Sequence, residues 1–380
     1  MSSSSGPVVA RGLEGVVAAE TVLSHVDGQA GRLIIGGYEL GEIAGRVGFE
    51  QAAHLLWQGR LPNPAELADL GREMAAQRRL PPLTLSVLRA AAGAPPIDAL
   101  RMGAATLTLG LPDPDDISRA ADLARAGMLA ARFPVMVATH LRLARGEEPI
   151  APRADLSHAA NFLWMTHGRE PDPIAARALD TYWVTVMDHG MNASTFTARV
   201  IASTRSDMVS AVTGAIGALK GPLHGGAPGP VLDMLHEIGT ASNAEPWLRA
   251  ELAAGRRIMG FGHRVYRVRD PRAEVLSRVA EELAGAALED RELFDLARQV
   301  EQVAVRVLAE HRPERQLTTN VEFYTALVLQ SLGLPPRGFV ALFACGRVAG
   351  WAAHVIEQHG EDRLIRPQSR YVGPQGLRLP

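Results

Sequence analysis

Apolar residues recur at three- and four-residue spacing along almost the whole chain, and no other feature of the sequence limits the fold as much. Between Pro64 and Gln77, the apolar side chains of Leu67, Leu70 and Met74 share one face, which predicts an amphipathic helix. The same spacing predicts further helices over roughly 117–144, 155–168, 173–189, 206–219, 228–239, 246–257, 271–286, 291–310, 320–332 and 336–358. The fold class is therefore predicted to be all-α.

Strand signals are few. Residues 32–35 (RLII) follow Asp27-Gly28 and predict a short hairpin near the N-terminus. Because strands do not alternate with helices, a doubly wound nucleotide-binding sheet is not expected. Glycine and proline are densest over residues 221–230 (GPLHGGAPGP), which are expected to be non-helical and to form a hinge or a domain junction.

Charge and cysteine content exclude several classes of protein. The 380 residues carry 39 Lys and Arg against 41 Asp and Glu, so the chain lacks the basic excess of a nucleic-acid-binding protein. Cys345 is the only cysteine, which excludes an internal disulfide and every multi-cysteine metal site. A lone cysteine also indicates a reducing compartment.

The N-terminal residues contain no apolar stretch of the kind found in secretory signals, so the chain is expected to be cytoplasmic. The most apolar run, residues 338–356, contains Arg347 and His354 and is expected to be a buried helix rather than a membrane span. A buried Arg347 needs an anionic partner, which a Glu, an Asp or a bound carboxylate would supply.

Three of the twelve histidines, His189, His224 and His263, lie beside glycines at bends. One such histidine could simply be hydrogen-bonded in a turn, but three together indicate a site, because glycine lets a substrate approach the backbone. No histidine pair has metal-ligand spacing, so no metal is expected. The Gly260-Phe261-Gly262 segment matches only part of a dinucleotide-binding motif and is not taken as one.

Two helix starts lie among these candidate residues. Asp270-Pro271 is a capping residue followed by a first-turn proline, and predicts a helix over 272–283. Asn320 or a preceding threonine is expected to cap another helix whose first turn contains Glu322, where a carboxylate also complements the helix dipole.

Four arginines lie close together in the sequence around the helix start at Asp270: Arg264, Arg267, Arg269 and Arg272. They indicate either a solvated basic loop or a place where a phosphorylated cofactor meets a carboxylate.

Five segments follow one another along the chain: His189-Gly-Met-Asn-Ala-Ser-Thr-Phe, Gly221-Pro-Leu-His224-Gly-Gly-Ala, Gly260-Phe-Gly-His263-Arg-Val-Tyr-Arg-Val-Arg-Asp-Pro-Arg272, Asn320-Val-Glu-Phe-Tyr and Gly346-Arg347-Val-Ala-Gly-Trp-Ala-Ala-His354. Together they resemble the citrate synthase family, and the similarity runs from about Arg11 to Val372. The resemblance implies a helical homodimer with a large domain (1–220 and 330–380) and a small domain (221–329) that close over oxaloacetate and then acetyl-CoA. It also implies an acyltransferase of the tricarboxylic acid cycle, with acetyl-CoA as co-substrate and no permanently bound cofactor.

The resemblance assigns the catalytic roles to three residues. His224 matches the histidine that stabilises the enol or enolate of acetyl-CoA, and His263 matches the one that polarises the oxaloacetate carbonyl. Glu322 stands where the family has an aspartate that abstracts the proton. The extra methylene moves the carboxylate by roughly 1 Å, which puts the rate and the choice of substrate in question.

The binding residues follow from the same matches. His189, Arg272 and Arg347 match the pocket for the oxaloacetate carboxylates, and Arg366 matches an arginine that acts across the dimer interface. For CoA, the resemblance implies that Arg267 lies near the phosphates. The backbone of Met259, Gly260, Phe261 and Gly262 would lie along the adenine.

Two other functions stay open at this point. A 2-methylcitrate synthase, which uses propionyl-CoA, would share every residue named above. Alternatively, Glu322 could mark a weakened homologue that binds acyl-CoA or oxaloacetate as a regulator or assembly partner.

Overall fold

The structure, a computed structural model, describes residues 9–225, 228–285 and 288–379. Within these ranges the chain forms sixteen α-helices and one small sheet, so the prediction of an all-α fold is confirmed. The helices are α1 (Leu40–Ile43), α2 (Phe49–Gln58), α3 (Pro64–Gln77), α4 (Pro82–Ala90), α5 (Pro96–Ala105), α6 (Arg119–Leu143), α7 (His158–His167), α8 (Pro173–Val186), α9 (Ala193–Ala202), α10 (Met208–Leu219), α11 (Pro228–Ile238), α12 (Ala241–Ala253), α13 (Pro271–Ala284), α14 (Leu288–His311), α15 (Val321–Ser331) and α16 (Phe339–Glu361). Short 3-10 turns cover Arg11–Leu13, Thr106–Gly110 and Pro336–Gly338.

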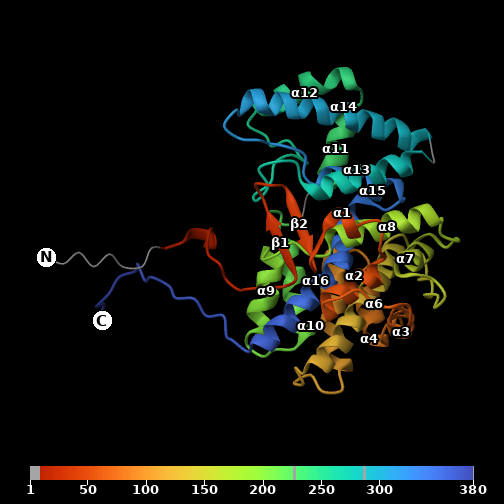
Figure 1. Cartoon of the computed structure of the whole chain (residues 1–380), viewed down its shortest axis with the longest axis vertical. Helices are drawn as coiled ribbons and strands as arrows, with labels where there is room; N and C mark the ends of the chain where they lie inside the picture. The colour runs from red at the N-terminus through yellow and green to blue at the C-terminus, as the bar shows by residue number, and fades with distance from the viewer. Residues whose placement is uncertain (1–8, 226–227, 286–287, 380) are drawn as a thin grey trace.

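The helices fall into two groups (Figure 1). Helices α11 to α15 gather at one end of the molecule, and α2 to α10 surround α16 at the other. Helix α8 lies at the junction, where it packs against α13 and α15. Both chain termini leave the body on the same side.

The small sheet has three strands, β1 (Ser24–Asp27), β2 (Arg32–Ile35) and β3 (Tyr38–Glu39). Strands β1 and β2 pair antiparallel, with Asp27 opposite Arg32, so the predicted hairpin is confirmed. The side chain of Asp27 accepts hydrogen bonds from the backbone N–H groups of Gln29 and Ala30 (3.0 and 2.9 Å), which fixes the turn.

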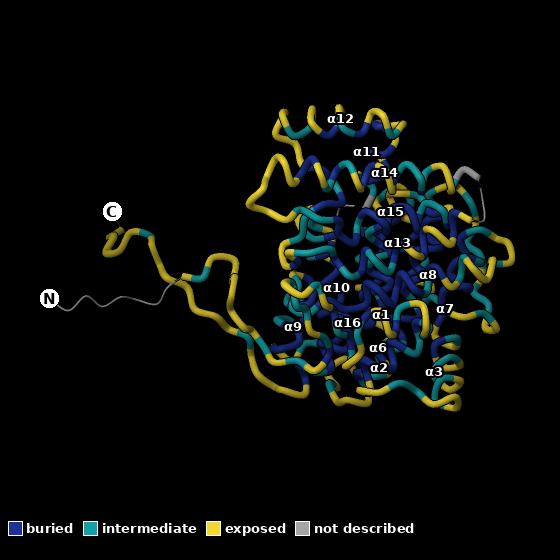
Figure 2. Tube along the Cα trace, turned by 45° about the horizontal axis from the view of Figure 1, so that its top comes forward, coloured by how far each residue is buried: buried dark blue, intermediate teal, exposed yellow. Residues whose placement is uncertain are grey.

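Helix α16 forms the centre of the larger group. By length and composition it could cross a membrane, but 89% of its most apolar 18-residue window is buried inside the protein. In Figure 2 it is dark blue along most of its length, so the expectation of a buried helix is confirmed. Its backbone accepts hydrogen bonds from two indoles, Trp183 Nε1 to Leu342 O (3.1 Å) and Trp57 Nε1 to Ala349 O (3.0 Å).

Both predicted helix starts are confirmed. The side chain of Asp270 caps α13 by accepting from Arg272 N (3.0 Å), and that of Asn320 caps α15 by accepting from Glu322 N (3.0 Å). These caps fix the backbone at two residues that the sequence singled out, Arg272 and Glu322.

Other helix predictions were wrong or incomplete. Helices α2, α4, α5 and α9, each nine or ten residues long, were not predicted, because they are shorter than the window of about 11–18 residues over which apolar spacing is read. Helix α11 begins at Pro228, where the apolar spacing predicts a helix, so the separate expectation that residues 221–230 are non-helical is wrong for 228–230. Prolines are tolerated there because first-turn N–H groups have no intrahelical acceptor. Helix α12 begins at Ala241, five residues before the predicted start.

Two glycines let α16 approach α8 and the residues that follow it. A Cβ atom at Gly350 would lie 2.2 Å from Met187 O and 3.0 Å from Asp188 Oδ1. A Cβ atom at Gly346 would lie 2.9 Å from the side chain of Val186. The backbone of α16 therefore contacts the segment around residue 188 without intervening side chains.

This packing predicts opposite effects for two glycine-to-alanine substitutions. Gly350→Ala should lower the free energy of unfolding by about 2 kcal/mol, because overpacking against the backbone exceeds the gain in helix propensity. Gly71→Ala in α3, where a Cβ atom meets nothing within 4 Å, should raise it by about 0.5–1 kcal/mol. Calorimetric melting of both variants checks this, and equal stabilisation by both would show that α16 is not so closely packed.

Candidate active site

Six predicted residues converge from six parts of the chain. His189 follows α8, His224 precedes α11 and His263 precedes α13, while Arg272, Glu322 and Arg347 lie on α13, α15 and α16. The rings of His189 and His263 lie 5.5 Å apart, and Arg272 Nη2 lies 3.2 Å from His263 Nε2. Arg347 is close enough to His189 and His224 to act on their pKa values. The six side chains thus form one cluster.

His263 has hydrogen-bond donors facing both ring nitrogens. Its Nδ1 accepts from the backbone N–H groups of Val265 and Tyr266 (3.0 and 3.1 Å). Burial, and then the charge of Arg272, lower the pKa of His263 to about 4, so the ring is neutral near pH 7. With Nδ1 as an acceptor the proton is assigned to Nε2, where it faces the Arg272 guanidinium, itself only a donor. An incoming oxygen atom would accept from both.

His224 is held by Ser194, at the start of α9. Its Nε2 accepts from Ser194 N (3.3 Å) and lies 2.8 Å from Ser194 Oγ. Burial, and then Arg347, lower the pKa of His224 to about 4. An accepting Nε2 assigns the proton of this neutral ring to Nδ1, which can donate to a substrate oxygen.

His189 lies deeper, with its Nε2 3.1 Å from the Tyr266 hydroxyl. Burial, Arg272 and His263 hold the pKa of His189 well below its usual range, so this ring is also neutral. All three histidines of the cluster can therefore act as neutral hydrogen-bond donors.

The two arginines are buried but differ in their partners. Arg272 forms a bidentate pair with the Asp270 carboxylate (3.0 and 2.8 Å). Arg347, which is 1% exposed, donates from Nε to Val186 O (2.6 Å) and lies over the Phe343 ring at 4.7 Å. Burial lowers the pKa of Arg347 to about 10, so the guanidinium is still charged near pH 7.

Arg347 has no carboxylate within 4.0 Å among the residues that the structure describes. The charge of the buried Asp188 opposes the effect of burial on the pKa of Arg347, but the two groups make no direct ion pair. The guanidinium can therefore still pair directly with a bound carboxylate. Arg272 Nη1 and the terminal nitrogens of Arg347 leave donors for such a ligand.

Glu322 lies in the first turn of α15 and is half-buried. Burial raises the pKa of its carboxyl to about 7, and the nearby Arg272 opposes this shift. A carboxyl group with this pKa is half ionised near neutral pH, which suits a general base.

Residues 260–262 are joined to the segment that carries Glu322. Gly260 O accepts from Asn320 N (2.9 Å), and Asn320 Nδ2 donates to Gly262 O (2.9 Å). Gly260 has a φ of 81°, and a Cβ atom there would lie 2.8 Å from the Phe323 ring. Only glycine fits at this position.

Two predicted residues lie outside the cluster. Arg267 is exposed on the loop after His263, and its N–H donates to Gly28 O (2.8 Å). Arg366 is exposed beyond the end of α16. The N–H group of its neighbour Ile365 donates to Ser203 Oγ at the C-terminal end of α9. Ser194, which contacts His224, lies at the other end of this helix, about 14 Å away. The single chain does not bring Arg366 to the other residues.

Sequence reasoning missed two residues that hold the histidines. Ser194 orients His224, and Tyr266 meets His189. A helix start at Asn192-Ala-Ser-Thr could have drawn attention to Ser194, because Asn192 Oδ1 caps α9 by accepting from Thr195 N (3.1 Å). Gly226 and Ala227 of the His224 motif lie outside the described residues.

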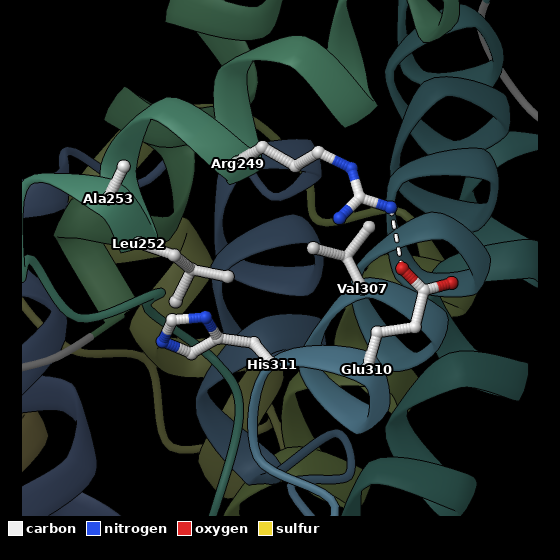
Figure 3. A pocket seen from close by; sticks show the side chains of 6 residues that line it. All are labelled: Arg249, Leu252, Ala253, Val307, Glu310 and His311. Atoms are coloured by element: carbon white, nitrogen blue, oxygen red, sulfur yellow. Dashed lines mark hydrogen bonds and ion pairs between the residues drawn. The ribbon is translucent and has the colours of Figure 1, made fainter.

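Surface pockets lie away from the cluster. One of about 330 Å³ lies between α12 and α14 (Figure 3), where Arg249 and Glu310 pair across it at 2.6 Å. Another of about 400 Å³ lies beside α14 and is lined by Arg269, Arg298, Glu301, Gln302, Val305, Thr318 and Thr319. In the described ranges, no group of three or more His, Cys, Asp or Glu side chains is placed to hold a metal ion.

The chain is similar to known proteins over nearly its whole length. Residues 12–368 match the family model described as citrate synthase, C-terminal domain. The chain is 40% identical to a citrate synthase from Haloferax volcanii, covering 97% of this chain and 96% of that protein. It is 41% identical to a 2-methylcitrate synthase from Mycobacterium tuberculosis, covering 98% and 93%.

A solved structure shares the fold. It is a citrate synthase from Thermoplasma acidophilum in a ternary complex with carboxymethyl coenzyme A and oxaloacetate. It superposes with a TM-score of 0.91 at 30% identity, covering 98% of both chains. The chain therefore belongs to the citrate synthase family of acyltransferase enzymes.

Proposed function

We propose that the chain condenses acetyl-CoA with oxaloacetate to give citrate and CoA. The observation that carries the proposal is the combination of two neutral histidine donors, His224 and His263, with a carboxyl group, Glu322, whose pKa is about 7. The ternary complex of the Thermoplasma acidophilum relative, with oxaloacetate and a CoA analogue, supports the choice of substrates.

Oxaloacetate binds first in this proposal, through its two carboxylates. Arg272 and Arg347 supply fixed positive charge, His189 a neutral donor, and Arg366 of the partner subunit a third cation. The ketone oxygen then takes the position between His263 Nε2 and Arg272, where both groups need an acceptor.

The methyl group of acetyl-CoA, which is a weak acid, is activated next. Glu322 removes a proton from the methyl group of acetyl-CoA while His224 Nδ1–H donates to the thioester oxygen. Proton removal alone would leave an unstabilised enolate, so both groups act in the same step. The nucleophilic carbon attacks the ketone of oxaloacetate, and His263 supplies the hydrogen bond or proton to the oxygen that becomes the hydroxyl. Water then cleaves the thioester of citryl-CoA, which releases citrate and CoA.

The proposal includes an assembly and a location. Large exposed apolar side chains, among them Val17, Val22, Tyr371 and Val372, lie on the two terminal segments that leave the body (Figure 2). Such surface is typical of an interface, so we propose a homodimer. We also propose that it is cytoplasmic.

CoA would lie along residues 259–262 with its phosphates near Arg267. Domain closure of residues 221–329 on residues 1–220 and 330–380 would exclude water.

A second candidate is 2-methylcitrate synthesis from propionyl-CoA. The 41% identity to a 2-methylcitrate synthase favours keeping it, and that reaction needs the same residues. Propionyl-CoA is larger than acetyl-CoA by one methylene group. The volume of the active site beside the reacting carbon atom would therefore distinguish the two substrates.

Thiol release from acetyl-CoA and from propionyl-CoA, each with oxaloacetate, tests the proposal. We expect turnover with acetyl-CoA to be the faster. Faster turnover with propionyl-CoA would identify a 2-methylcitrate synthase. No turnover by the wild type with either substrate would favour the other hypothesis, that the chain is a weakened homologue that binds acyl-CoA or oxaloacetate without catalysis.

Variants of Glu322 then identify the base in the same assay. Glu322→Gln, which keeps the size of the side chain, should lower kcat about a thousandfold, because the amide cannot accept the proton. Glu322→Asp should lower kcat about a hundredfold, because the carboxylate is displaced by roughly 1 Å. Activity that appears only in Glu322→Asp would mean that glutamate here prevents catalysis.

The pH dependence of kcat should reflect the same group. Glu322 accepts a proton only as the carboxylate, and its pKa is about 7, so kcat should fall as pH drops through 7 and level off above about pH 8. His224 and His263, each with a pKa of about 4, stay neutral over this range and do not limit the rate. A decline centred near pH 4.5 would instead mean that the base is a carboxylate whose pKa burial does not raise.

Mixing two impaired variants at a limiting concentration of oxaloacetate tests whether Arg366 acts across the interface. Arg366→Ala should raise the KM for oxaloacetate without lowering the melting temperature, because the side chain is exposed. In dimers that combine one Arg366→Ala chain with one Glu322→Gln chain, one site of the two is complete. Co-refolded mixtures should therefore regain about a quarter of the wild-type activity. No recovery would show that Arg366 acts within its own chain, and wild-type kinetics of Arg366→Ala alone would show that it has no role.

A further inference from the structure

The two peptide neighbours of His189 are held by a single hydroxyl group. Ser24, the first residue of β1, donates from Oγ to Asp188 Oδ2 and accepts from Gly190 N (3.0 Å). A serine hydroxyl has one proton and two acceptor positions, so it can make both bonds at once. Ser24 lies 164 positions from Asp188 in sequence. Its hydroxyl group joins Asp188 to Gly190, the residues on either side of His189.

Asp188 is fixed from the other side by α16. Its Oδ1 lies 3.2 Å from His354 Nε2, and both side chains are fully buried. The charge and hydrogen bonds of His354, together with Ser24, hold the pKa of Asp188 below its usual value in spite of burial. The carboxylate therefore remains charged, and Ser24 supplies one of its few hydrogen-bond donors.

The same network anchors the chain just before β1. His354 Nδ1 lies 3.2 Å from the buried Arg199, which pairs with Glu357. Glu357 Oε1 accepts from Val22 N (3.0 Å) and Thr21 Oγ1 (3.2 Å). Residues 21–24 are thus attached at two points to polar groups that α16 also holds.

The other end of the hairpin contacts the segment that follows His263. Gly28 O accepts from Arg267 N (2.8 Å), and a Cβ atom at Gly28 would lie 2.3 Å from Val265 O. Val265 N is one of the two donors to His263 Nδ1. One hairpin therefore contacts the backbone beside both histidines whose rings lie 5.5 Å apart in the cluster.

We propose that the β1–β2 hairpin is a positioning element for oxaloacetate, in which Ser24 sets the orientation of His189 through Asp188 and Gly190. The inference rests on the proposed function, because it assumes that His189 and His263 bind oxaloacetate. Ser24 is a positioning residue and not a catalytic one, since its hydroxyl group bonds to Asp188 and Gly190 and acts on His189 through them. Its removal should affect oxaloacetate more than acetyl-CoA.

The test is the dissociation constant of oxaloacetate, measured by titration calorimetry on the full chain, beside the KM values for both substrates. Ser24→Ala should raise the dissociation constant about tenfold, as expected when one hydrogen bond to a charged group is lost, and should change the KM for acetyl-CoA less than twofold. Ser24→Thr, which keeps the hydroxyl, should restore binding to within about threefold.

Thr84→Val is the matched control for folding. Thr84 is fully buried in α4, and its hydroxyl lies 2.7 Å from that of Thr106, away from the cluster. Thr84→Val should lower the melting temperature by about as much as Ser24→Ala does, and it should leave oxaloacetate binding unchanged.

If both variants lose stability alike and both bind oxaloacetate as the wild type does, the positioning role is overturned. If Ser24→Ala weakens the two substrates equally, the effect is general and the inference also fails. A wild type that binds no oxaloacetate would instead overturn the proposed function, and this inference with it.

Discussion

Two buried guanidinium groups determine the chemistry of the cluster. Arg272 and Arg347 are 4% and 1% exposed, and their charge adds to burial in lowering the pKa values of the histidines around them. The histidines are consequently neutral near pH 7 and donate hydrogen bonds without carrying charge. Asp270 pairs directly with Arg272, whereas Arg347 contacts a carbonyl group and an aromatic face and is compensated at longer range by the charge of Asp188. Both guanidinium groups keep donors with which an anionic substrate can pair directly.

Helix α16 gives these groups a fixed frame. Its glycines permit backbone contact with the segment after α8, and it carries both Arg347 and His354. Indole hydrogen bonds to its carbonyl groups attach it to neighbouring helices. A site built on such a packed helix holds its side chains more precisely than a site built on loops alone. The histidines, which do lie on connecting segments, are in turn held by Ser194, Tyr266 and the residues beside β1.

The local parts of this arrangement could be predicted from sequence, and the long-range parts could not. Asp270 and Asn320 were recognised as caps because a capping residue acts within three positions of itself. The six clustered residues were singled out from their glycine neighbours, helix starts or expected burial, but only the resemblance to a family assigned them roles. The hydrogen bond from Ser24 to Asp188 joins positions 164 residues apart, and only the folded chain shows it. Helix α9 was missed because its buried face consists of small and polar residues, which give no apolar spacing: Ser194, Thr195, Ala198, Arg199 and Ala202.

The donors that face each other at His263 and Arg272 have a thermodynamic consequence. His263 Nε2 and Arg272 Nη2 lie 3.2 Å apart, so one oxygen atom of a ligand can accept hydrogen bonds from both. A dianion that accepts them binds the folded chain but not the unfolded one, in which the two donors are far apart. At a hundred times its dissociation constant, such a ligand adds about 2.7 kcal/mol to the free energy of unfolding. The supply of substrate then sets how long the folded chain survives as well as how fast it works.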